Sequence, residues 1–64
     1  MNFSDFLGRI MEFEIYKDER DEYRWRLWDN SEIIAASQDG FDSYQEALDE
    51  VERVKLVASR AGIK

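Results

Sequence analysis

The chain contains no cysteine and no histidine. Without cysteine there is neither a disulfide nor a thiolate nucleophile, and without both residue types a tetrahedral zinc site and histidine-ligated haem are excluded. The carboxylates lie on expected strand and helix surfaces, with no apolar pocket that would raise a pKa for general acid catalysis. The sequence therefore predicts a protein that is not an enzyme, with no catalytic residue, no metal and no cofactor.

Proline is also absent, and glycine occurs at only three of the 64 positions. No low-complexity stretch or internal repeat is present, so no linker divides the chain. A chain of 7.7 kDa has room for one core. Because 44% of the residues are hydrophobic and 14% aromatic, the composition is that of a folded domain rather than an unstructured chain.

Long apolar runs are missing as well, and the first ten residues carry an acid at Asp5 without a basic region before an apolar stretch. We therefore expect no membrane segment and a cytoplasmic location. Fifteen acids against nine bases give a net charge of −6, which opposes attraction to nucleic acid or anionic lipid. The acidic, lysine-poor balance is typical of a high-salt cytoplasm, so a halophilic source is expected.

Residues 11–17 and 23–28 alternate between apolar and charged side chains, which is the period of a half-buried strand. The five residues between them, 18–22, are all charged. They lack the alternating oxygen ligands and central glycine of a calcium-binding loop, so they predict a solvated turn. The pattern is that of strand, turn and strand.

Antiparallel pairing around this turn gives the sheet two different faces. The apolar residues of both strands would share an inner face. Glu12 and Glu14 would share the outer face with Arg24 and Arg26 and neutralise both arginines.

A third strand is expected over residues 33–37, after a turn in which Asn30 suits a positive φ. A two-residue turn at positions 30 and 31 sets the faces of this strand. It would place Ile34 and Ala36 on the inner face and Ile33 and Ala35 on the outer face next to Trp28.

Ser43 followed by Glu46 fits a capping box, so a helix should begin there. Apolar residues then recur at spacings of three and four up to Ala58, and Gly62 is the expected stop. Leu56 falls opposite this stripe and Val57 at its margin, and they are either loose ends or part of a contact with another chain.

The first ten residues form an extension that precedes the domain expected over residues 11–64. Their apolar side chains are spaced as in a short amphipathic helix: Phe3, Phe6, Leu7 and Ile10. Such a helix would dock on its own domain, complete a dimer or be offered to a partner groove.

The order of these pieces resembles the YegP-like family of small bacterial and archaeal proteins, whose function is not established. Tyr23-Arg24-Trp25-Arg26-Leu27 resembles the most characteristic stretch of that family, and Gly40-Phe41 resembles its loop before the helix. The resemblance implies an α+β fold of three antiparallel strands and one C-terminal helix. It also implies that single units pair as a homodimer, and it brings no catalytic residue.

The predicted core is thin, and without disulfide or metal a chain of this size usually needs oligomerisation. We therefore expect a non-catalytic homodimeric interaction module whose ligand and protein partner are not identified by the sequence. The candidate binding or dimer face comprises Tyr16, Arg24, Arg26, Trp28 and Ile33. The alternative is a nucleic-acid-binding module that uses the same face, as integrase arm-binding domains use a three-stranded sheet, although the net charge disfavours it.

Overall fold

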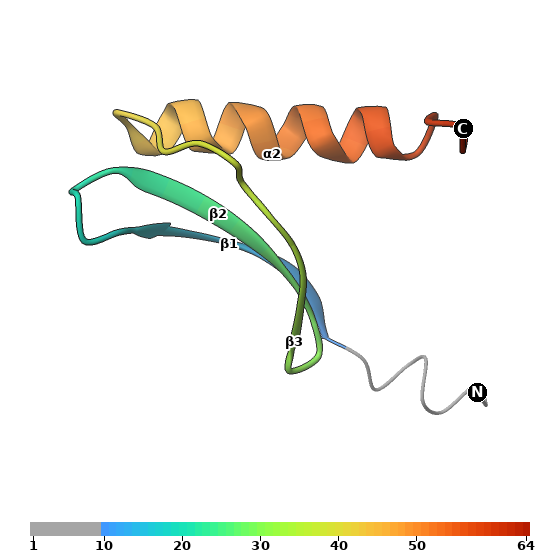
Figure 1. Cartoon of the computed structure of the whole chain (residues 1–64), viewed down its shortest axis with the longest axis horizontal. Helices are drawn as coiled ribbons and strands as arrows, with labels where there is room; N and C mark the ends of the chain where they lie inside the picture. The colour runs from blue at the N-terminus through green and yellow to red at the C-terminus, as the bar shows by residue number, and fades with distance from the viewer. Residues whose placement is uncertain (1–9) are drawn as a thin grey trace.

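The computed structural model describes residues 10–64 and contains a sheet and a helix. The sheet is antiparallel in the order β1-β2-β3, and the helix lies across one of its faces (Figure 1). The elements are β1 (Met11–Lys17), β2 (Tyr23–Asp29), β3 (Glu32–Ala36) and α2 (Tyr44–Ala58). The α+β prediction is confirmed. The helix expected within residues 1–10 lies outside the described residues, apart from Ile10, which belongs to no helix.

The pairing of β1 with β2 has the register that the alternation predicts. Phe13 lies opposite Leu27, and Glu14 lies opposite Arg26. Because paired residues point to the same side of a sheet, the apolar set faces α2 and the charged set faces away from it. These two surfaces are called the inner and the outer face below.

The face assignment of β3 is partly wrong, because a β-bulge interrupts its pairing with β2. Ile33 lies opposite Trp28 on the outer face, as predicted. Beyond the bulge, Ala35 lies opposite Leu27 and Ala36 opposite Arg26, which reverses the predicted faces of both alanines. The extra residue between the paired positions is Ile34, and one inserted residue moves every later side chain to the other face.

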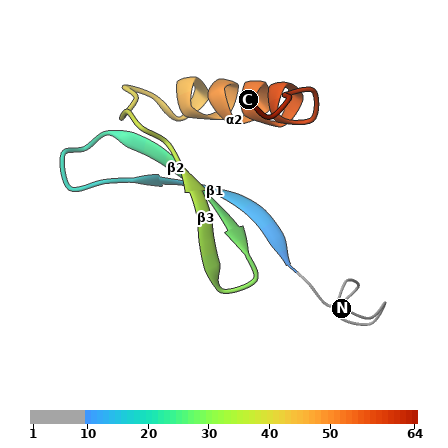
Figure 2. The same ribbon diagram turned by 45° about the vertical axis from the view of Figure 1, so that its right-hand side comes forward.

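After β3 the chain continues alongside β2 in the antiparallel direction and reaches the start of the helix (Figure 2). The amide of Ser37 donates to the carbonyl of Trp25 at 2.8 Å, and the Ser37 hydroxyl accepts from the Trp25 amide at 3.1 Å. Phe41 then exchanges two backbone hydrogen bonds with Tyr23, at 2.7 and 2.8 Å. The loop is therefore anchored to β2 at both ends.

The helix begins with the predicted Ser43 cap, whose hydroxyl accepts from the Glu46 amide at 3.1 Å. The Glu46 carboxylate accepts in return from the amide of Asp42, one residue before the usual partner. The helix ends at Ala58, earlier than predicted. Gly62 does not have the positive φ of a glycine stop, and the Ser59 hydroxyl caps the end by donating to the Leu56 carbonyl.

The core lies between the inner face and the first half of α2. Three apolar side chains are buried among the described residues: Trp25, Ala47 and Val51. The ring of Phe13 packs edge-on against Trp25, with 5.5 Å between the ring centroids. A core of this size covers only part of either element.

Candidate functional site on the outer face

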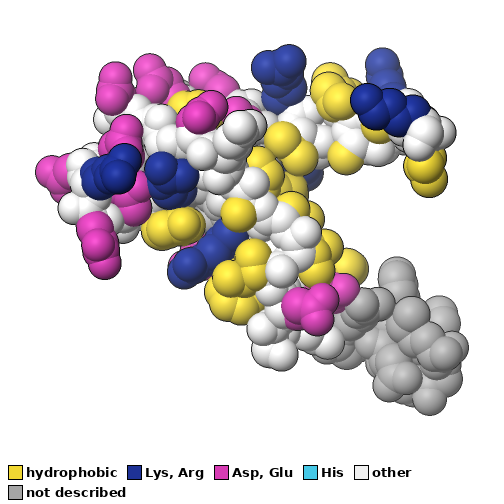
Figure 3. Space-filling model, in the orientation of Figure 1, with side chains coloured by type: hydrophobic (Ala, Val, Ile, Leu, Met, Phe, Trp, Pro, Cys, Tyr) yellow, Lys and Arg dark blue, Asp and Glu magenta, His cyan; other side chains and the backbone are white. Residues whose placement is uncertain are grey.

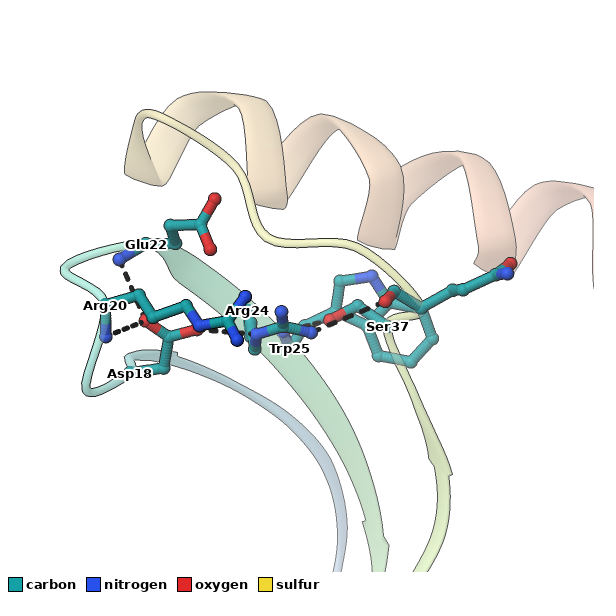
Figure 4. A network of polar contacts seen from close by, with 7 residues as sticks. Asp18, Arg20, Glu22, Arg24, Trp25 and Ser37 are labelled. Carbon is teal, nitrogen blue, oxygen red and sulfur yellow. Dashed lines mark hydrogen bonds and ion pairs between the residues drawn. The ribbon is translucent and has the colours of Figure 1, made fainter.

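The turn between β1 and β2 is organised by the side chain of Asp18, which is 16% exposed. Its Oδ1 accepts from the amides of Arg20 and Glu22, each at 2.9 Å, and its Oδ2 accepts from Nε of Arg24 at 2.6 Å (Figure 4). The sequence predicts only a solvated turn at this position. A local signal could have identified this role. An Asp side chain at the start of a turn often accepts a hydrogen bond from the backbone amide two residues later, which here is the amide of Arg20.

These bonds favour the charged forms of Asp18 and Arg24. The backbone hydrogen bond from Glu22, and next the contact with Arg24, lower the pKa of the Asp18 carboxyl. The same contact raises the pKa of Arg24. Arg24 lies on the outer face opposite Tyr16, and its charge is neutralised by Asp18. The prediction that Glu12 and Glu14 neutralise both arginines is therefore wrong for Arg24, although Arg26 does pair with Glu14.

Further along the outer face, four side chains form an outer-face cluster. Nε of Arg26 donates to Oε1 of Glu14 at 2.5 Å, and the indole nitrogen of Trp28 donates to the same oxygen at 2.9 Å. The guanidinium carbon of Arg26 lies 4.2 Å from the ring centroid of Tyr16 and 5.5 Å from that of Trp28. The members are Glu14, Tyr16, Arg26 and Trp28.

Contacts within the cluster favour the charged forms of Glu14 and Arg26. The hydrogen bonds from Arg26, and next from Trp28, lower the pKa of the Glu14 carboxyl, and Glu14 raises the pKa of Arg26. The Arg26 guanidinium lies within cation–π distance of both rings, which adds an attraction. Because Glu14 and Arg26 are 41% and 31% exposed, water screens this ion pair, and its main effect is to fix geometry.

The outer face brings together three of the five predicted site residues, Tyr16, Arg26 and Trp28. Ile33 lies beside them, opposite Trp28, and is 46% exposed. Arg24 is directed to the turn by Asp18.

Glu12 lies opposite Trp28, and its carboxylate forms no ion pair or hydrogen bond with any of residues 10–64. An open hollow of about 410 Å³ adjoins it. The hollow is lined by Glu12, Phe13, Glu14, Arg26, Trp28 and Asn30. Two acidic residues, one arginine and one tryptophan therefore line the same hollow.

A second hollow, of about 280 Å³, runs along α2 and is mainly apolar. It is lined by Glu50, Arg53, Val54, Val57 and Ala58. Within residues 10–64 no group of three or more acidic side chains is placed to hold a metal ion. In the same part of the chain, no helix has the length and apolarity to span a membrane.

Comparison with known proteins identifies relatives. The model of a domain of unknown function, DUF1508, matches residues 18–64. Two UPF0339 proteins of Neisseria meningitidis, from serogroups B and A, are each 39% identical to this chain over 54 residues, which is 84% of this chain and 96% of the relative.

Among solved structures, the NMR solution structure of a protein from Haloferax volcanii has a TM-score of 0.79 and 40% identity. The match covers 84% of this chain and 92% of that one. The chain belongs to the DUF1508 family of unknown function, which confirms the resemblance to small uncharacterised YegP-like proteins.

Proposed function

We propose that this member of the DUF1508 family acts in the cytoplasm as a non-catalytic interaction module that pairs as a homodimer. The observation that supports the proposal is an uncovered apolar opening between the helix and the sheet. Among residues 10–64 only three apolar side chains are buried, whereas Val57 on the helix is 53% exposed. The described part of the chain therefore leaves apolar surface uncovered.

The opening arises because the sheet bends away from the second half of α2 (Figure 1). Within the described residues α2 contacts β1 and β2 but not β3. Figure 3 shows hydrophobic side chains on both walls of the opening. Val54 and Val57 line the hollow along the helix, while Leu27 and Ala35 lie on the inner face of the strands.

A second copy of the chain is the occupant that fits this opening. The helix wall needs an apolar sheet beneath it, and the sheet wall needs a helix above it, so two copies related by a two-fold axis can each supply what the other lacks. The rim of the hollow carries one acid, Glu50, and one base, Arg53, so two identical rims meet without net repulsion there. Apolar burial of this kind is the usual support for a chain with so small a core.

Light scattering tests the dimer with a matched pair of variants. Val57 and Leu56 are neighbours with exposed fractions of 53% and 57%, but only Val57 lines the hollow. We expect Val57→Glu to shift the mass from a dimer to the 7.7 kDa monomer, because it places a charge in the interface. Leu56→Glu should remain dimeric. A monomeric wild-type protein, or a dimer that survives Val57→Glu, contradicts the proposal.

The outer face is left for a ligand in this arrangement. Nucleic-acid binding is the second candidate function, because Arg26 beside the rings of Tyr16 and Trp28 resembles the aromatic and basic surfaces on which bases stack. Against it, both outer-face arginines are paired with carboxylates and the net charge is −6. Under this candidate, Arg24→Ala and Arg26→Ala should weaken oligonucleotide binding and flatten its salt dependence.

A further inference from the structure

The contacts of the Arg26 guanidinium show which groups of the outer face can bind a guanidinium. Its flat group lies within cation–π distance of two rings and donates to a carboxylate, the combination that aromatic and acidic sites use to bind arginine. A lysine ammonium is more strongly hydrated and cannot stack in this way. The same surface is therefore chemically suited to guanidinium groups.

The hollow beside the cluster offers the same groups without an occupant from residues 10–64. Glu12 supplies a carboxylate with no partner in this part of the chain, and it pairs with Trp28 across the strands and lines the hollow with it. The hydrogen bonds from Arg26 and Trp28 both end on Oε1 of Glu14, so Oε2 of that residue retains accepting capacity. A volume of about 410 Å³ between these side chains is large enough for the end of an arginine.

The residues around the hollow carry an excess of negative charge, which favours a positively charged ligand. Of its lining residues, Glu12 and Glu14 are acidic and Arg26 is the sole base, so one negative charge is uncompensated. The net charge of −6 adds a long-range field that attracts cations and repels phosphates. Charge complementarity therefore favours a basic partner over nucleic acid on this face.

We infer that the hollow between Glu12 and Trp28 binds an arginine side chain that is presented by a basic segment of another protein. The guanidinium stacks on the indole of Trp28 and donates to the carboxylate of Glu12. The inference rests on the proposed role as an interaction module and names the chemistry of its ligand. Whether the chain also pairs as a dimer is measured separately.

The test uses the full-length, ¹⁵N-labelled protein and follows the two indole N–H signals by NMR. The probes are a hexa-arginine peptide, a hexa-lysine peptide and a twelve-nucleotide single-stranded DNA, each at low and high salt. We expect hexa-arginine to shift the Trp28 signal to saturation, to leave the buried Trp25 signal in place, and to bind less tightly at high salt. Hexa-lysine should bind about three- to fivefold more weakly.

Glu12→Gln is the decisive variant, because Glu12 has no partner within residues 10–64 whose loss would unfold the protein. It should weaken hexa-arginine binding about three- to fivefold. Glu52→Gln, at an exposed position on the helix, is the matched control for the change in net charge and should have a much smaller effect.

Equal binding of both peptides, equal effects of the two variants, or a preference for the oligonucleotide overturns the inference. A Glu12→Gln protein that becomes monomeric in light scattering also overturns it, because the hollow would then be an interface between copies. Arginine binding by a monomeric wild-type protein would instead leave this inference standing and refute the dimer.

Discussion

The indole nitrogen of Trp25 donates a 2.7 Å hydrogen bond to the carboxylate of Glu50. Trp25 is 5% exposed and lies at the centre of the sheet, whereas Glu50 lies on α2. One polar contact therefore joins the two layers of the fold within a core that is otherwise apolar. It also satisfies the single polar group of the buried indole.

Glu50→Ala should lower the free energy of unfolding by about 1 to 3 kcal/mol, because the indole N–H would stay buried without an acceptor. Urea denaturation measures the change. Glu50→Gln retains a carbonyl oxygen and should be much milder, and Glu52→Ala, two residues along the helix, should be nearly neutral. Equal losses for the alanine variants at positions 50 and 52 would show that the hydrogen bond does not contribute.

Trp25→Ala should be severe, with a loss of about 3 to 5 kcal/mol, because it removes the largest buried side chain of the core. Trp28→Ala, on the outer face, should cost clearly less. Thermal unfolding followed by far-ultraviolet circular dichroism compares the two. A larger loss at Trp28 would reverse the assignment of inner and outer faces.

Gly40→Ala should destabilise the protein by about 1 to 3 kcal/mol, because an added Cβ would lie 2.8 Å from Cβ of Glu22. Neither atom belongs to the flexible end of a side chain, so the loop that pairs with β2 has to shift. Gly62→Ala is the control, since a Cβ there meets nothing within 4 Å. Calorimetric melting of both variants decides the point, and a Gly40→Ala protein as stable as Gly62→Ala would contradict this account.

Acid should weaken the fold through Asp18 and Glu14. The folded protein lowers the pKa of both carboxyls below their usual values of 3.8 and 4.5, so both contribute stability above those values. That contribution is lost as the pH falls from about 4.5 through the lowered pKa values of the folded state. Urea midpoints measured between pH 7 and pH 2.5 should fall in this window.

Asp18→Asn and Glu14→Gln provide the control for the acid effect. Each removes one titrating group, so the decline in the urea midpoint should become shallower in each variant. An unchanged decline in both variants would assign the acid sensitivity to other carboxyls.

The alternation of residues in β1 and β2 was sufficient to predict their register and their two faces. The buried Trp25 and the half-buried Leu27 lie on one side and enforce the pairing, since a slip by one residue would bury charges. The Ser43 cap was equally predictable, because the motif is local to four residues. The φ of 58° at Asn30 also follows from the residue type.

Other features depend on contacts that no local pattern encodes. No glycine near Ile34 signals the bulge in the sequence. The bulge places Ala35 and Ala36 on the faces opposite to those that the alternation predicts. The pairing of Arg24 with Asp18 depends on how the turn folds back, with Asp21 at a φ of 67°. The sequence placed Tyr16, Arg26 and Trp28 on one face, but the position of Arg26 within reach of both rings depends on the three-dimensional shape of the sheet.

The bulge in β3 also bears on how the protein avoids aggregation. All five residues of this edge strand are exposed, and four of them are apolar, which is the kind of edge onto which foreign strands add. By inserting Ile34, the chain breaks the regular spacing of hydrogen-bonding groups and increases the local twist. An incoming strand cannot stay in register along the whole edge. The irregular backbone therefore opposes strand addition to an apolar edge strand that carries only one charged residue.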